Sequence, residues 1–168
     1  MKKIFFPLIA LIFFVVTPWS VSAADKLAIR KLTFTKDIKG LGSYTPWGST
    51  RFTLDDICTV YVEAEGFAIP LTPKTEDEYN IDIAVDVAVK LPQTKRVLTF
   101  QPNMDALTGI IRSELSAYFL SFSFAFEGWT PGNYLLEIGV RDNLGGQVVS
   151  QDLAFQLVEP TEADIKAK

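Results

Sequence analysis

The stretch Asn80–Lys90, NIDIAVDVAVK, alternates β-branched apolar residues with acidic residues and alanine. In an extended strand successive side chains point to opposite faces, so this pattern places every β-branched residue on one face. A helix would distribute the same residues around its whole circumference. The residues of the apolar face are Ile81, Ile83, Val85, Val87 and Val89. The stretch therefore predicts a β-strand with one face in a hydrophobic core.

Four further stretches alternate in the same way and predict strands of the same kind. They are Ile57–Ala64, Tyr118–Phe126, Tyr134–Val140 and the segment that contains Leu153, Phe155 and Leu157. In Tyr118–Phe126 phenylalanines alternate with small residues. This composition indicates a central strand whose bulky face fills the core.

Two weaker strand candidates are Leu27–Thr35 and Arg96–Phe100. The apolar residues of the first change phase part-way along, which predicts a bulge near Arg30 and Lys31. The segment Met104–Ser116 is ambiguous. Its composition allows a short helix, but a glycine near its middle opposes a long one.

The predicted strands number about seven, and no long segment has a helical period. A chain of this kind buries two apolar faces against each other, in a sandwich or in a barrel. Because the loops vary in length, we expect an antiparallel β-sandwich. Residues 24–158 are predicted to form this single all-β domain. Residues 159–168 are polar and are expected to form a flexible tail.

The stretch Gly128–Gly146, GWTPGNYLLEIGVRDNLGG, holds two turns with a strand between them. Pro131 and Gly132 form the first turn, because proline presets φ and glycine accepts a positive φ. The segment Asp142–Gly146 predicts a hairpin loop. It has no adjacent lysine and no following helix for a phosphate, and no further spaced carboxylates for calcium.

The pattern Pro131-Gly132-x-Tyr134, followed by alternating apolar residues, resembles the penultimate strand of immunoglobulin-like domains. Fibronectin type III-like bacterial modules share this pattern, and the resemblance covers Gly128–Leu157. It implies an immunoglobulin-like sandwich in which the Tyr134 hydroxyl bonds back to a nearby backbone group. It also implies an adhesion, binding or scaffold role, without fixing a ligand. The paired cysteines of antibody domains are missing from this sequence.

Residues 1–23 have the composition of a signal peptide. Lys2 and Lys3 precede the uncharged apolar run Ile4–Val16, and Val21-Ser22-Ala23 supplies small residues for cleavage. As a helix this run would span only about 20 Å, less than the roughly 30 Å of a bilayer core. We therefore expect cleavage after Ala23, the alternative being a retained anchor. The mature protein is expected to be periplasmic or secreted, and not membrane-spanning.

Several chemistries conflict with the composition of the chain. It contains no histidine, which removes Ser-His-Asp and Cys-His catalysis and the usual zinc sites. The net charge of −4 lacks the basic excess that a nucleic-acid partner requires. Cys58, the single cysteine, excludes an intramolecular disulfide and is expected to point into the core with Val60. We predict no metal and no cofactor.

Acidic residues occur close together at Asp55-Asp56, Glu63 with Glu65, and Glu76-Asp77-Glu78. Two converging carboxylates are the minimum for a glycosidase that works without histidine. Solvated loops and outward strand faces are the simpler interpretation of these positions. No catalytic residue is therefore predicted.

The segment Gly40–Thr50, GLGSYTPWGST, is the most informative surface candidate. It is uncharged, rich in small polar residues, and carries Tyr44 and Trp47. Tyrosine and tryptophan provide large contact areas at low entropic cost, as in recognition loops. Tyr61 and Glu63, on the outward face of their strand, are candidates to join the same patch. The alternative for Trp47 is that it folds under the loop and covers one end of the core.

The sequence therefore predicts an exported, non-enzymatic binding or scaffold module. Its expected partner is a protein of the cell envelope, with a glycan second. One alternative is a carbohydrate-binding module, and another is a carboxylate hydrolase acting on cell-wall polysaccharide. A third is a subunit of a larger envelope assembly, which would have an exposed apolar patch or an open strand edge.

Overall fold

The computed structural model describes residues 26–72, 78–113 and 115–161, and all of the regular structure in these residues is β-strand. The predicted signal peptide, residues 1–23, and most of the predicted tail lie outside the described residues. No helix in the described ranges is long and apolar enough to cross a membrane. The all-β prediction is confirmed.

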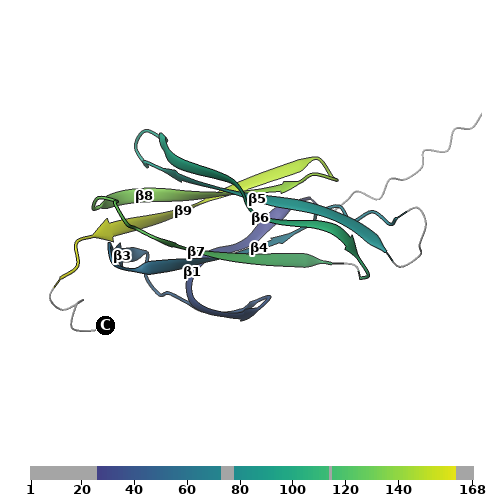
Figure 1. The fold of residues 1–168 in the computed structure, drawn as a ribbon, viewed down its shortest axis with the longest axis horizontal. Helices are drawn as coiled ribbons and strands as arrows, with labels where there is room; N and C mark the ends of the chain where they lie inside the picture. The colour runs from purple at the N-terminus through teal and green to yellow at the C-terminus, as the bar shows by residue number, and fades with distance from the viewer. Residues whose placement is uncertain (1–25, 73–77, 114, 162–168) are drawn as a thin grey trace, which may run out of the picture.

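The strands form two facing sheets, as Figure 1 shows. The four-stranded sheet has the order β2-β1-β4-β7, and the five-stranded sheet has the order β3-β9-β8-β5-β6. Every pairing is antiparallel except β3 with β9, which is parallel. The strands are β1 (Ala28–Gly40), β2 (Ser43–Pro46), β3 (Arg51–Thr53), β4 (Ile57–Glu65), β5 (Tyr79–Lys90), β6 (Val97–Ile111), β7 (Ala117–Ala125), β8 (Gly132–Asp142) and β9 (Gln147–Val158).

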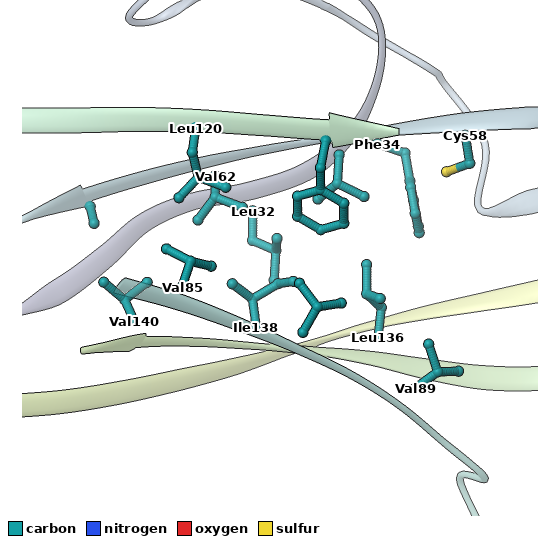
Figure 2. Packing of buried hydrophobic residues seen from close by; sticks show 14 of the residues in the cluster. Leu32, Phe34, Cys58, Val62, Val85, Val89, Leu120, Leu136, Ile138 and Val140 are labelled. Carbon is teal, nitrogen blue, oxygen red and sulfur yellow. The ribbon is translucent and has the colours of Figure 1, made fainter. Parts of the chain in front are cut away.

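The core lies between the two sheets, where alternate side chains of the long strands meet. Figure 2 shows Leu32, Val62 and Leu120 of one sheet facing Val85, Ile138 and Val140 of the other. The predicted apolar face of β5 is buried along its whole length, with Ile81, Ile83, Val85, Val87 and Val89 each at most 9% exposed. The predicted inward faces of β4 and β8 are buried as well.

The prediction of about seven strands was too low, since the described residues contain nine. The two additional strands are the short β2 and β3, in the region predicted as a surface loop and its continuation. A strand of three or four residues has too few positions for an alternating pattern to be recognised. The predicted bulge in the first strand is confirmed, because the register of β1 shifts between Ile29 and Lys31.

The possible short helix in Met104–Ser116 was wrong, because residues 97–111 form the single long strand β6. β6 lies at the edge of its sheet and pairs only with β5 among the described strands. Most of its residues are exposed on both faces. When both faces of a strand are exposed to solvent, its sequence need not alternate between apolar and polar residues, so the pattern could not identify β6.

The prediction of a central position for the phenylalanine-rich strand was also wrong. β7 is an edge strand, paired with β4 alone among the described strands. Its apolar face is nevertheless inward, with Leu120 and Phe122 at most 9% exposed, and Phe126 directly after the strand is buried as well. The alternation of apolar residues indicates which face of a strand meets the opposite sheet. It does not indicate which strands pair with it within its own sheet.

The glycine-rich stretch after β8 is a hairpin loop, as predicted. The carboxylate of Asp142 is 1% exposed and accepts backbone N–H groups from Ala68, Leu144 and Gly145 at 2.7 to 3.1 Å. A Cβ added to Gly145 would stand 2.2 Å from Asp142 Oδ2, so only glycine fits there. The acid of this loop therefore holds the fold together and is not presented to a ligand.

Candidate functional site

Three of the four predicted site residues meet on the outer face of the four-stranded sheet. The ring of Tyr44 stacks on that of Tyr61 with centroids 4.5 Å apart, and Phe119 stacks on Tyr61 at 5.7 Å. The Tyr61 hydroxyl donates to Glu63 Oε2 at 2.9 Å and accepts the Gly42 N–H at 2.8 Å. The predicted grouping of Tyr44, Tyr61 and Glu63 is therefore present.

Tyr61 is not available to a ligand, which corrects the prediction that it is an exposed site residue. Its side chain faces outward but is 0% exposed, because Tyr44 and the turn at Gly42 cover it. Burial is the main cause that raises the pKa of Tyr61, and the hydrogen bond to Glu63 raises it further. The cluster attaches the β1–β2 hairpin to the sheet, which is a structural role.

Trp47 lies apart from this cluster and packs on the core, so the prediction that it shares the patch was wrong. Its ring is 5.3 Å from that of Phe52, and its backbone N–H donates to the Phe34 carbonyl at 3.0 Å. The ammonium group of Lys36 lies over the ring at 5.8 Å from its centroid. Trp47 follows β2 in one sheet and precedes β3 in the other, so it covers the side where the chain changes sheets.

Among the described residues, the single cysteine and several of the carboxylates have structural roles. Cys58 is 0% exposed, and burial raises the pKa of its thiol well above the usual range. Asp56 accepts the Thr53 N–H at 2.7 Å, in the turn before β4, and Glu65 pairs with Arg30 at 3.2 Å. Residues 76 and 77 of the third acidic group lie outside the described residues.

Asp86 on β5 is a carboxylate that bonds to an arginine as well as to a backbone N–H. It accepts two hydrogen bonds from Arg141 at 2.8 and 3.1 Å and one from the Asn103 N–H at 2.9 Å. Partial burial opposes its ionisation, but the bonds from Arg141 and Asn103 hold the pKa of Asp86 below its ordinary value. A general acid needs a raised pKa, so the lowered pKa of Asp86 does not suit that role.

Two shallow grooves lie beside Trp129, in the loop between β7 and β8. The first, here called the β6-side groove, encloses about 290 Å³ and is lined by Leu98, Thr99, Gly128, Trp129, Thr130 and Tyr134. The second, here called the acidic groove, encloses about 380 Å³ and includes Leu54, Asp55, Asp56, Glu127, Gly128 and Trp129 in its lining. Because Gly128 and Trp129 line both, the tryptophan stands between them.

The position of Trp129 is set by the core beneath it. Its ring lies 5.1 Å from Tyr134 and 5.9 Å from Phe126, between ring centroids. The Tyr134 hydroxyl in turn donates to the Thr130 carbonyl at 2.7 Å, the bond that the resemblance implies. Gly128 has φ +77°, a conformation that favours glycine, and it brings the chain back over the end of the core. The loop therefore presents a fixed aromatic side chain to the grooves.

Exposed apolar side chains continue from the β6-side groove along β6. Leu98 is 42% exposed, Val97 is 49% exposed and Phe100 is 58% exposed. Phe100 pairs with Ala88, an outward position of β5, so its ring lies on the outer face of the five-stranded sheet. We call Val97, Leu98 and Phe100 the β6 apolar cluster.

Sequence reasoning missed the β6 apolar cluster and both grooves. It also gave no surface role to Trp129, whose ring packs on Phe126 and Phe155 at the end of the core. A signal was available in Val97-Leu98-x-Phe100, because the adjacent Val97 and Leu98 cannot both face one core from a strand.

Comparison with known proteins assigns no family, since no family model and no curated protein matches this sequence. One similar solved structure is the Pseudomonas fluorescens alkylpurine DNA glycosylase AlkC bound to DNA with an abasic site analogue, 11% identical over 79% of this chain and 30% of that one, with TM-score 0.46. Others are a β-glucosidase from Erythrobacter marinus (11% identity, 79% and 15% covered, TM-score 0.44) and one from Listeria innocua in complex with glucose (9%, 79% and 16%, 0.44). The chain spans less than a third of each, and likenesses this weak carry no argument about function.

Proposed function

We propose that this chain is an exported, immunoglobulin-like module that binds a protein partner through the β6 apolar cluster and the adjoining β6-side groove. The observation that carries the proposal is the exposure of three large apolar side chains, Val97, Leu98 and Phe100, next to a groove that contains a fixed tryptophan. Several large apolar side chains exposed beside one groove are typical of an interaction site in a soluble protein.

The strand arrangement supports the immunoglobulin-like part of the proposal. β1, β4 and β7 are neighbours in one sheet, and β9, β8 and β5 are neighbours in the other. Immunoglobulin-type sandwiches place strands A, B and E, and strands G, F and C, in the same relation. Tyr134 at the start of β8 then corresponds to the tyrosine at the start of strand F, with its hydroxyl bonded upstream to Thr130.

The choice of a protein over a glycan rests on how the aromatic residues are used. A sugar-stacking site needs an aromatic face open to solvent beside free polar groups. In the cluster on the four-stranded sheet, one face of Tyr44 is covered by Tyr61, and Glu63 already accepts the Tyr61 hydroxyl. The β6 apolar cluster instead offers aliphatic and phenyl groups, which suit the apolar side chains of a protein.

Export and a periplasmic or secreted location remain part of the proposal. They rest on the composition of residues 1–23, with its basic start, apolar run and small residues before Ala24. Cell fractionation of a tagged chain, with N-terminal sequencing of the mature protein, tests this part. A mature protein that still begins at Met1 would contradict it.

Site-specific photo-cross-linking in intact cells tests the binding site. A photoreactive phenylalanine analogue is placed at position 98 or 100, and in a matched control at position 148 on β9. Val148 is 70% exposed and lies outside both grooves. We expect one cross-linked protein from positions 98 and 100 and none from 148. Equal cross-linking from all three positions, or none from 98 and 100, would overturn the proposed site.

A further inference from the structure

We infer that the partner of this module inserts a basic residue next to an apolar one, with the basic side chain in the acidic groove and the apolar one against Trp129. This inference rests on the proposed function and specifies the chemistry of the partner. It concerns the acidic groove, which the proposed binding site itself does not require.

Trp129 and Leu54 are the side chains that would contact the apolar residue of the partner. Both side chains are half-buried and pack on the core, so each keeps part of its surface in the groove. Trp129 is held by Phe126, Tyr134 and Phe155 at centroid distances of 5.1 to 6.4 Å. A side chain fixed before binding loses little conformational freedom when a ligand contacts it.

The charged half depends on Asp55 and Glu127, which line the acidic groove and are exposed. Neither carboxylate has a hydrogen bond or ion pair among the described residues. Asp56 adds a third negative charge but is already bonded to the Thr53 N–H. The residues described in the lining include no lysine or arginine to neutralise these groups, so the charged side chains of the groove are all negative.

A basic side chain fits this groove better than a metal ion does. Among the described residues no three acidic or cysteine side chains stand close enough to hold a metal. A lysine or arginine needs only one or two carboxylates, and its aliphatic stem can lie on an aromatic ring. Leu54 and Trp129 in the same lining supply the surface for that stem.

The test is an NMR titration of the mature chain, residues 24–168, with synthetic tripeptides as probes. The first probe is acetyl-Lys-Leu-Lys-amide, and two matched probes replace both lysines with glutamate or the leucine with serine. We expect saturable shifts of the Gly128 amide and the Trp129 indole N–H with the first probe. Binding should weaken at least fivefold for each matched probe, and it should weaken as salt is added.

Charge-removal variants locate the contact. The double variant Asp55→Asn with Glu127→Gln should weaken binding of the first probe at least threefold. The matched control, Asp37→Asn with Glu159→Gln, removes two exposed carboxylates outside the groove and should leave binding unchanged. Both variants should keep the thermal midpoint of the wild type, since none of these carboxylates has a hydrogen bond or ion pair within the described part of the chain.

The outcomes separate this inference from the proposed function. Three results would each overturn the inference. The first is equal binding of the lysine and glutamate probes, and the second is unchanged binding in the groove variant. The third is the absence of a saturable shift up to about 10 mM probe, on the order of the weakest measurable affinities. If the partner still cross-links at positions 98 and 100 in the groove variant, the proposed function stands and the inference alone fails. If cross-linking at those positions is absent in the wild type, the proposed function fails.

Discussion

β5 and β6 are the two strands of one hairpin, yet they differ in almost every property that stabilises a fold. β5 lies between β8 and β6, and both its faces are largely buried. β6 lies outside it, at the edge of the sheet, and is exposed for most of its length. The hairpin that joins them rises beyond β8 and β9 in Figure 1. One strand supplies core and the other supplies surface.

The difference extends to the regularity of pairing. β5 pairs with β8 in an unbroken register from Ile83 to Lys90. Against β6 the register shifts, because residues 102–104 stand opposite Asp86 alone. Asn103 adopts φ +51° there, and its N–H and side-chain carbonyl bond to Asp86 and Arg141. A bulge of this kind protects an exposed edge from pairing with another chain.

The largest expected effect comes from comparing a buried position of β5 with an exposed one of β6. Ile83→Ala should lower the free energy of unfolding by about 2 to 5 kcal/mol, because it leaves a cavity at a site 1% exposed. Ile110→Ala should change it by less than about 0.5 kcal/mol, because the side chain is 60% exposed. Urea denaturation measures both, and equal losses would contradict the assignment of core and surface.

The next effect concerns the bonds that hold the β6 bulge to β5. Asp86→Asn should cost about 1 to 2 kcal/mol, a range that allows for the partial exposure of Arg141. The pKa of Asp86 is lowered in the folded state, so its contribution is complete above the unfolded value of about 3.9. That contribution disappears as the pH falls from there through the folded pKa. The stability curves of wild type and variant, measured from pH 7 to 2, should therefore converge at the acidic end.

A third substitution tests the backbone of β6 without touching its packing. Gly109 has φ +147°, and a Cβ added there meets no atom within 4 Å. Gly109→Ala should cost about 1 kcal/mol or slightly more, because the strain lies in the main chain. The control Ala106→Gly, on the same strand, adds no such strain. Thermal melts of the two variants compare the costs, and a stabilised Gly109→Ala would show that the backbone relaxes.

The smallest effect on stability is expected at the proposed binding site. Phe100→Ser should change the free energy of unfolding by less than about 0.5 kcal/mol, since the ring is 58% exposed. The same substitution should remove most cross-linking at position 98. If Phe100→Ser instead destabilised the protein as much as Ile83→Ala, β6 would belong to the core and the proposed site would be wrong.

The sequence predictions succeeded for strands with one buried face and failed for the strand without one. Strands that meet the opposite sheet, such as β5 and β8, were identified because alternation is imposed by one buried face. β6 was missed for most of its length because no face is uniformly buried. β7 was identified as a strand but misplaced within its sheet, since alternation does not report lateral neighbours.

The candidate site could be predicted only in part. The pairing of Tyr61 with Glu63 follows from their spacing on one strand, and Tyr44 joins them through the β1–β2 hairpin. That Tyr61 would be covered, and that Trp47 would lie elsewhere, depends on the direction in which this hairpin folds. No local pattern encodes that direction, because it results from contacts between residues distant in sequence.

The sequence by itself determined that this chain forms two layers of strands, since period-two burial is a local property of neighbouring residues. It also determined that the loop after β8 turns on Asp142 and glycine, because those residues stand within a few positions of one another. Only the tertiary structure decided which strands lie at the edges and which aromatic residues reach the surface. Those outcomes depend on contacts between segments that are distant in the sequence. The two grooves, for example, are lined by residues as far apart in the sequence as Leu54, Leu98 and Trp129.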